Sequence, residues 1–148
     1  MSELSGVQPS EVVPERRRIV DLALVFVGGT GGTLARFGIA ELLPTPTGLP
    51  LGILLINISG AFLLGLFLET LAHRGPDEGR RRSVRLLAGT GFLGGFTTYS
   101  ALAVDALLLL GTGRALEGVA YLVGSVVLGL GAGALGVLLG SRARGTAP

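Results

Sequence analysis

Four long apolar runs constrain this chain more than any other feature of its sequence. They extend from Ile19 to about Leu43, from Leu51 to Leu71, from Val84 to Leu110 and from Gly118 to Ser141. A helix needs about 20 residues to cross the apolar core of a bilayer, and every run reaches that length. The fourth run contains no charged residue. The sequence therefore predicts an all-α membrane protein with four transmembrane helices and short connections.

The composition supports this reading and excludes several classes of protein. Charged residues make up 15% of the 148 residues, against about 25% in soluble domains. Cysteine is absent and His73 is the only histidine, which excludes disulfides and disfavours zinc or histidine metal sites. No nucleophile–base pair is evident, so an enzyme is not expected. All twelve basic residues are arginines, most of them in short clusters beside the apolar runs, and no soluble basic face for nucleic acid is indicated.

The polar segments divide the chain into a membrane domain and two tails. Residues 1–15 are polar and contain two prolines, which predicts a disordered N-terminal tail. Residues 16–141 form the predicted four-helix transmembrane domain, and residues 142–148 form a C-terminal tail. Inside the domain, Ala72–Ser83 and Gly111–Glu117 are expected to be loops.

Polar residues inside the first two spans are candidates for function, because polar side chains are costly in hydrocarbon. Gly28, Gly32 and Arg36 are spaced by four residues and share one helix face. This places Arg36 toward protein or water, although an arginine that extends to the interface is the alternative. Asn57 lies deep in the second span, where its amide offers hydrogen-bond donors or simply joins two helices.

The third span contains the most unusual segment. Gly89–Ser100 holds four glycines and five hydroxyl side chains in twelve residues. Each glycine lowers helix propensity by about 1 kcal/mol relative to alanine. The segment predicts a helix that is broken at mid-membrane, with backbone groups lining a site. A continuous helix with small residues at an interface is the alternative.

The fourth span places Tyr121, Ser125, Gly129 and Gly133 on one face, which predicts a hydroxyl track beside a packing seam, or packing alone. Across all four spans N–H and O–H donors are plentiful, and no carboxylate lies near the middle of a span. Such a lining suits a small anion that accepts strong hydrogen bonds and argues against a proton-coupled transporter.

Three segments in chain order resemble the fluoride channel family, called Fluc or CrcB: Gly28–Phe37, Gly52–Gly65 and Gly91–Ser100. The resemblance implies an antiparallel dimer of four-helix subunits with two pores along the subunit interface. It also implies passive, fluoride-selective export from the cytoplasm. A structural sodium ion at the dimer centre is implied as well, held without being transported by the backbone carbonyls of Gly94 and Thr97 and their partner equivalents.

The same resemblance implies which side chains contribute to the pore or its vestibules. Six polar residues match such positions: Arg36, Asn57, Thr98, Ser100, Tyr121 and Ser125. The family usually has two pore-lining phenylalanines after the threonine pair, and here Tyr99 and Leu102 occupy those positions. An aromatic ring edge is electropositive and can contact an anion. The pore surface of this chain is therefore expected to be degenerate.

Two other functions fit a small four-helix membrane protein. A multidrug transporter would need an acidic residue inside the first span, and Asp21 lies only three residues after an arginine cluster, close to the interface. A structural subunit without transport would not require a broken third helix, since unpaired backbone in a membrane is costly.

The arginines predict the orientation. Ten lie on one side of a four-span topology: Arg16, Arg17, Arg18, Arg74, Arg80, Arg81, Arg82, Arg85, Arg142 and Arg144. Only Arg114 lies in a loop on the other side. The positive-inside rule then places both termini in the cytoplasm, with the protein in the cell membrane. A self-sufficient antiparallel homodimer needs balanced loops, so an oppositely oriented paralogue is the predicted partner and a homodimer is the alternative.

Overall fold

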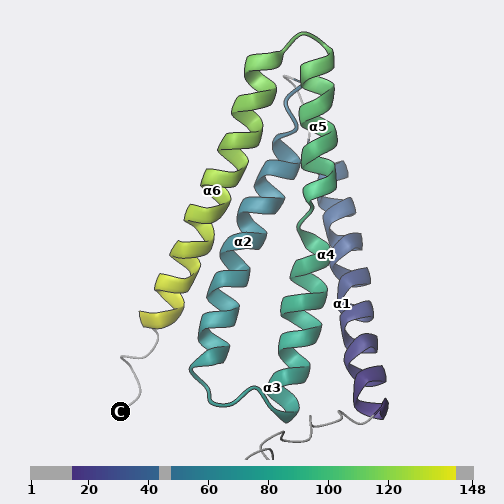
Figure 1. Ribbon diagram of the computed structural model, residues 1–148, viewed down its shortest axis with the longest axis vertical. Helices are drawn as coiled ribbons and strands as arrows, with labels where there is room; N and C mark the ends of the chain where they lie inside the picture. Colours follow the sequence, from purple (N-terminus) through teal and green to yellow (C-terminus); the bar gives the residue numbers. More distant parts are fainter. Residues whose placement is uncertain (1–14, 44–47, 143–148) are drawn as a thin grey trace, which may run out of the picture.

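The computed structural model describes residues 15–43 and 48–142 (Figure 1). Within these residues all regular secondary structure is helical, and the first, second and fourth spans are α1 (Glu15–Leu42), α2 (Leu51–Ala72) and α6 (Ala115–Arg142). The third span is built from four consecutive segments: α3 (Gly79–Val84), the π-helix η1 (Arg85–Leu93), α4 (Gly94–Phe96) and α5 (Tyr99–Gly111). Each of the four spans is long and apolar enough to cross a membrane. The prediction of an all-α, four-span protein is confirmed.

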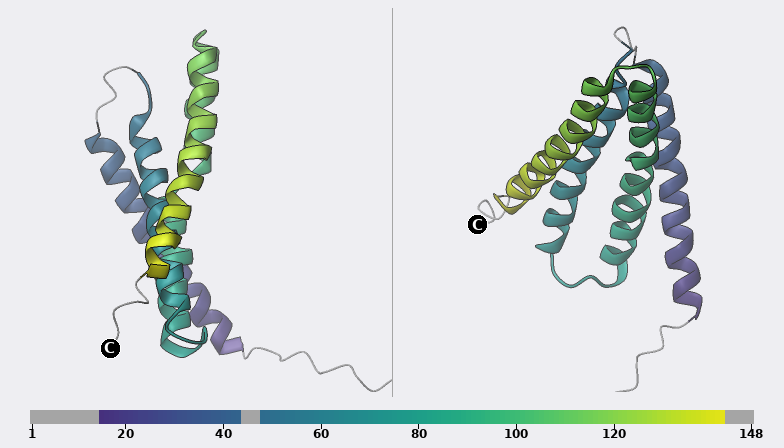
Figure 2. Two further views of the ribbon diagram at one scale, coloured as in Figure 1. Left: turned by 90° about the vertical axis from the view of Figure 1, so that its left-hand side faces the viewer. Right: turned by 45° about the horizontal axis from the view of Figure 1, so that its top comes forward.

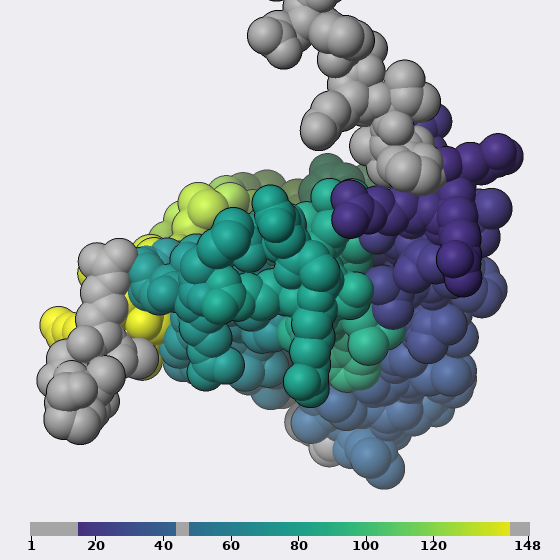
Figure 3. All heavy atoms as spheres, turned by 90° about the horizontal axis from the view of Figure 1, so that it is seen from below, coloured from purple at the N-terminus to yellow at the C-terminus, as the bar shows by residue number. Residues whose placement is uncertain are grey.

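The spans lie side by side, with α6 and α1 at opposite edges of the bundle and α2 and the third span between them (Figures 1 and 2). Helix α6 packs on α2 and α5, whereas α1 packs mainly on η1 and α4. One end of the bundle is formed by the start of α1, the connection between α2 and α3, and the end of α6. Figure 3 shows the molecule from this end.

Close packing of α2 on α6 depends on glycines, as the small-residue pattern of the fourth span predicts. A Cβ atom at Gly65 would lie 2.3 Å from the carbonyl oxygen of Gly133. A Cβ atom at Gly136 would lie 2.2 Å from the carbonyl oxygen of Phe62. No side chain fits at either position, so the two backbones are in direct contact.

Much of the apolar surface of the chain is exposed. Large apolar side chains such as Phe26, Leu42, Leu116 and Leu130 are exposed along the outer faces of the helices. In water this surface would cause aggregation, but lipid tails are as apolar as leucine. These faces are therefore suited to lipid or to a second membrane-embedded chain, and the protein is a multi-pass membrane protein.

The helix ends correct several predicted boundaries. Helix α1 begins at Glu15, inside the expected tail, and the rest of that tail lies outside the described residues. Helix α6 ends at Arg142, the first residue of the expected C-terminal tail. The expected loop Ala72–Ser83 is shorter, because α3 already begins at Gly79. The second loop also shortens, to residues 112–114. Helices continue past the hydrocarbon into the interface, where charged side chains cost little free energy. Hydropathy alone therefore predicts helices that are too short at their charged ends.

The π-helix η1 was not predicted from the sequence. Gly28 and Gly91 bring α1 and η1 into backbone contact, since a Cβ atom at Gly28 would lie 2.1 Å from the carbonyl oxygen of Leu87. A glycine-rich segment can adopt several helical forms at similar free energy. Here the segment in contact with α1 adopts the π-helix, which is wider than an α-helix. Short π-helical segments are frequent at functional sites.

Candidate functional site at the break in the third span

The third span is interrupted at Thr97 and Thr98, as the sequence predicts. Thr97 has φ −77° and ψ 156°, and Thr98 has φ −150° and ψ 125°, so both are extended. The hydroxyl of Thr98 accepts a hydrogen bond from the amide of Ala101 at 3.2 Å and thereby caps the start of α5. The end of α4 and the start of α5 meet here. The carbonyl end of a helix favours cations, and its amide end favours anions.

Asn57 holds this extended backbone in place from α2. Its Nδ2 donates to the carbonyl oxygen of Thr98 at 2.9 Å. Its Oδ1 accepts from the amide of Thr98 at 2.8 Å. The side chain therefore pairs with both backbone groups of one residue, as a neighbouring β-strand would. A carboxamide has two N–H donors, so one of them is left for another acceptor.

Two side chains of α1, Thr33 and Arg36, contact α4 just before the break. The hydroxyl of Thr33 donates to the carbonyl oxygen of Gly95 at 3.3 Å, and Nε of Arg36 donates to the same oxygen at 3.4 Å. Arg36 is half-buried and faces protein at the middle of the third span, not the far interface. Together with Asn57, these contacts fix α4 and α5 relative to α1 and α2.

Two glycines allow the helices to approach this site. A Cβ atom at Gly32 would lie 1.9 Å from the carbonyl oxygen of Phe92. A Cβ atom at Gly60 would lie 2.4 Å from Cγ2 of Thr97. Sequence reasoning gave Gly60 no role in the site, and it named Thr33 only as one of the polar residues inside the spans. Their spacing was a usable signal, since Gly60 follows Asn57 by three residues and Thr33 precedes Arg36 by three.

Part of the site is exposed on the surface of the chain. Tyr99 is 79% exposed, and Gly94 and Ser100 are exposed beside it. The hydroxyls of Thr98 and Ser100 lie 3.1 Å apart. A Cβ atom at Gly94 would meet nothing within 4 Å, so packing within the chain does not require glycine there. The exposed polar groups of the break therefore form a face at mid-membrane depth.

The remaining residues from the sequence analysis lie apart from this face. Leu102 and Tyr121 are only 5% and 7% exposed and pack in one cluster with Ala106 and Leu109. The hydroxyl of Ser125 donates to the carbonyl oxygen of Tyr121 at 2.6 Å, within α6. These three residues are buried within the chain, and a pore role for them stays a prediction.

The Tyr121 hydroxyl joins three helices near the end of the bundle that is opposite the termini. It lies 3.4 Å from the carbonyl oxygen of Pro50 and 3.5 Å from Oδ2 of Asp105. Asp105 is half-buried. Sequence spacing did not predict this contact, because Asp105 and Tyr121 lie on different helices. Within residues 15–43 and 48–142 no cluster of histidine or acidic side chains could bind a metal ion.

Comparison with known protein families matches residues 23–137 to the family described as "CrcB-like protein, Camphor Resistance (CrcB)". The chain belongs to the CrcB family. The match contains every residue of the site above, from Gly28 to Ser125. The resemblance to the fluoride channel family is thereby confirmed, and this family consists of ion channels rather than enzymes.

Individual relatives in the CrcB family agree with this assignment. The chain is 54% identical to "Fluoride-specific ion channel FluC 1" of Cutibacterium acnes over 114 residues, which cover 76% of this chain and 80% of the relative. It is 49% identical to "Fluoride-specific ion channel FluC 2" of Leifsonia xyli over 120 residues, 81% and 83% of the two chains. Identity to "Fluoride-specific ion channel FluC" of Paracoccus denitrificans is 44% over 117 residues, 78% and 90% of the two chains.

Proposed function

We propose that this CrcB-family chain is one subunit of a fluoride-selective channel that lets cytoplasmic fluoride leave the cell passively. The observation that carries the proposal is the exposed break in the third span, where hydroxyl groups and the amide end of α5 lie together. Hydrogen-bond donors of this kind replace the water shell of a small anion. The membrane potential supplies about 2.3 kcal/mol per charge per 100 mV, so an anion leaves a negative interior without a pump.

The open face at the break fits a dimer as the working form, and the family resemblance implies that the two subunits are antiparallel. A pore that strips the water shell from an ion must be enclosed on all sides, yet Tyr99, Ser100 and Gly94 lie on an open face of this chain. A second subunit on that face would enclose them. The open space at Gly94 is what a partner backbone in close contact would require, because a methyl group there would separate the two chains.

A structural sodium ion at the dimer centre fits the hydrogen bonding at the break. In a continuous helix the amide of Thr98 would bond to the carbonyl of Gly94, and the amide of Ala101 would bond to that of Thr97. Here these amides donate to Asn57 Oδ1 and to the Thr98 hydroxyl instead. Both carbonyls proposed as ligands are thus relieved of their helical donors, and such oxygens suit a hard cation. The ion would hold the two subunits' breaks together and carry no current.

Two features count against the other functions. Asp21, in the first half of α1, pairs with Arg82 at 2.6 Å and is not placed to exchange protons with a drug. The relatives named above carry the name of a fluoride channel, which favours transport over a structural role.

The orientation proposal has both termini in the cytoplasm. The arginines of the described residues divide unequally between the two ends of the bundle. The terminal end holds Arg16, Arg17, Arg18, Arg74, Arg80, Arg81, Arg82, Arg85 and Arg142, and the other end holds Arg114. Such a bias fixes one insertion direction. An antiparallel pair then needs an oppositely oriented paralogue, which could supply the phenylalanines that Tyr99 and Leu102 replace.

Two experiments test the proposal. Fluoride and chloride efflux are measured from proteoliposomes that contain this chain with its partner, in sodium and then in a large organic cation. Fluoride flux far above chloride flux, lost when sodium is replaced, is the expected result. Equal flux of the two anions contradicts the channel proposal, and unchanged fluoride flux without sodium contradicts the sodium site.

Orientation is read separately, from the chain expressed alone. Single cysteines are placed at the N-terminus and at Gly113, and labelled from each side of the membrane. Labelling of each site from one side only is expected. Equal labelling from both sides, or full fluoride flux from the purified chain alone, would favour the homodimer.

A further inference from the structure

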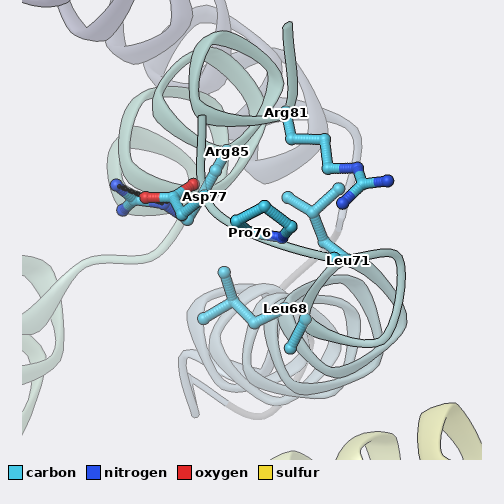
Figure 4. A pocket seen from close by; sticks show the side chains of 8 residues that line it. Leu68, Leu71, Pro76, Asp77, Arg81 and Arg85 are labelled. Atoms are coloured by element: carbon cyan, nitrogen blue, oxygen red, sulfur yellow. Dashed lines mark hydrogen bonds and ion pairs between the residues drawn. The ribbon is translucent and has the colours of Figure 1, made fainter. Parts of the chain in front are cut away.

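A pocket of about 190 Å³ opens at the terminal end of the bundle, between the last turns of α2 and the start of the third span (Figure 4). Eight residues line it: Leu68, Leu71, Ala72, Gly75, Pro76, Asp77, Arg81 and Arg85. Arg81 precedes Gly94 by thirteen residues, which is about 20 Å along a helix. The pocket is therefore separate from the proposed ion pathway and lies at the level of lipid headgroups.

One of the two arginines in this pocket is already neutralised. Nη2 of Arg85 lies 2.7 Å from Oδ2 of Asp77, and its Nε lies 2.9 Å from both carboxylate oxygens. The Arg85 guanidinium holds the pKa of the Asp77 carboxyl below its usual range, so the pair is ionised at neutral pH. Figure 4 shows this pair on one side of Pro76.

Arg81 lies on the other side of Pro76, above Leu71 (Figure 4). Its guanidinium makes no ion pair or side-chain hydrogen bond with any residue that the structure describes, although the side chain is half-buried. It lies against Gly75, where a Cβ atom would be 2.1 Å from Nη1, and the φ of +113° at this glycine also disfavours other residues. The chain thus holds a cation with five unused N–H donors over an apolar wall.

We propose that this pocket binds an anionic phospholipid, with the phosphate on Arg81 and an acyl chain along Leu68 and Leu71. The planar guanidinium matches the geometry of phosphate oxygens better than a point charge does. Basic pockets between membrane helices on the cytoplasmic side are typical sites for anionic headgroups. A free phosphate would use the same guanidinium but would leave the apolar wall uncovered, so the combination favours a lipid.

The other charges at this end support the same ligand. Arg82 is paired with Asp21, and His73 with Glu69, so Arg81 provides the unpaired charge within the pocket itself. The surrounding arginines raise the local concentration of anionic lipid, but they do not form a specific binding site for it. The site would therefore bind the lipid of the leaflet in which the termini lie, independently of fluoride conduction.

The test is lipid retention measured by native mass spectrometry on the purified channel assembly in mild detergent. Phosphatidylglycerol is titrated against phosphatidylcholine with the same acyl chains. We expect wild type to retain the anionic lipid preferentially and Arg81→Ala to bind it about fivefold more weakly, the factor that corresponds to about 1 kcal/mol for one basic side chain. Arg80→Ala is the matched control, since Arg80 is adjacent, equally charged, exposed and outside the pocket. It should change retention less than twofold.

Several outcomes would overturn the proposal. Equal losses in Arg81→Ala and Arg80→Ala would show diffuse attraction without a site. Equal retention of the two lipids by wild type would show that the pocket does not distinguish an anionic headgroup from a zwitterionic one. Displacement of the lipid by glycerol phosphate at the same concentration would identify a soluble phosphate as the ligand. Arg81→Lys keeps the charge without the planar fork and should retain an intermediate amount, which covers the case where Arg81→Ala does not fold.

Discussion

Replacing Asn57 by alanine removes both hydrogen bonds that hold the backbone of Thr98 at the break. The lost bonds run at 2.9 and 2.8 Å, and both Thr98 backbone groups are left without their partner. An interhelical hydrogen bond in a membrane is worth about 0.6 kcal/mol on average, and an unsatisfied buried backbone group costs about 1–3 kcal/mol. We therefore expect Asn57→Ala to lower the free energy of unfolding by about 1–4 kcal/mol.

The same substitution should impair transport more than it impairs folding. Without Asn57 Oδ1, the amide of Thr98 is released toward the carbonyl of Gly94, and the third span can close into a continuous helix. A shift of 1.4 kcal/mol between these two forms changes their ratio tenfold. Fluoride efflux from proteoliposomes should thus fall by about tenfold or more, measured beside unfolding in a denaturing detergent series.

Two further variants make this experiment decisive. Asn57→Asp keeps an acceptor for the Thr98 amide and loses the donor to its carbonyl, so it should be intermediate. Ser59→Ala is the control, because the Ser59 hydroxyl bonds only to the carbonyl of Ile56 on its own helix, at 3.1 Å. Our account of the break is refuted if Asn57→Ala unfolds and conducts like Ser59→Ala.

Three other substitutions test separate parts of the structure. Gly94→Ala should leave the stability of the lone subunit unchanged, because its Cβ meets nothing within 4 Å, and should abolish fluoride flux and dimer formation on a sizing column. Gly32→Ala should destabilise the subunit by about 1–3 kcal/mol in the same unfolding assay, since its Cβ would overlap the carbonyl of Phe92. Asp77→Asn should remove a pH dependence of the free energy of unfolding. Arg85 lowers the pKa of Asp77 in the folded state, so the ionised carboxylate stabilises the fold at pH values above its unfolded pKa of about 4. This stabilisation is lost as the pH falls through the lower pKa of the folded state.

These predictions have their own controls and opposite outcomes. Gly38→Ala adds a methyl group to the same helix as Gly32 at a position with nothing within 4 Å, and should be neutral. Equal destabilisation by both would show that helix packing at Gly32 is not as described. Retained dimer and flux in Gly94→Ala would argue against a partner backbone at that face. An acid-unfolding curve that is the same for Asp77→Asn and wild type would show that the exposed Asp77–Arg85 pair contributes nothing measurable.

Hydropathy was sufficient to place the four spans, because a membrane helix must satisfy its own backbone and present apolar side chains over its whole length. The break was also visible in the sequence, since Gly89–Ser100 combines poor helix formers with hydroxyl side chains. The shared face of Gly28, Gly32 and Arg36 followed from the helical period. Each of these three features depends only on residues close together in the sequence, so it can be predicted without knowing how the rest of the chain packs.

Other features depended on contacts between segments far apart in the chain. The partner of Asn57 is the backbone of Thr98, 41 residues later, and no local pattern joins them. The π-helical form of η1 arises where it meets α1. Leu102 was expected at a pore, and the fold of the single subunit buries it against Tyr121. Sequence determined which segments cross the membrane, whereas tertiary packing decided which groups meet there, because a helix face has no partner until another helix is placed against it.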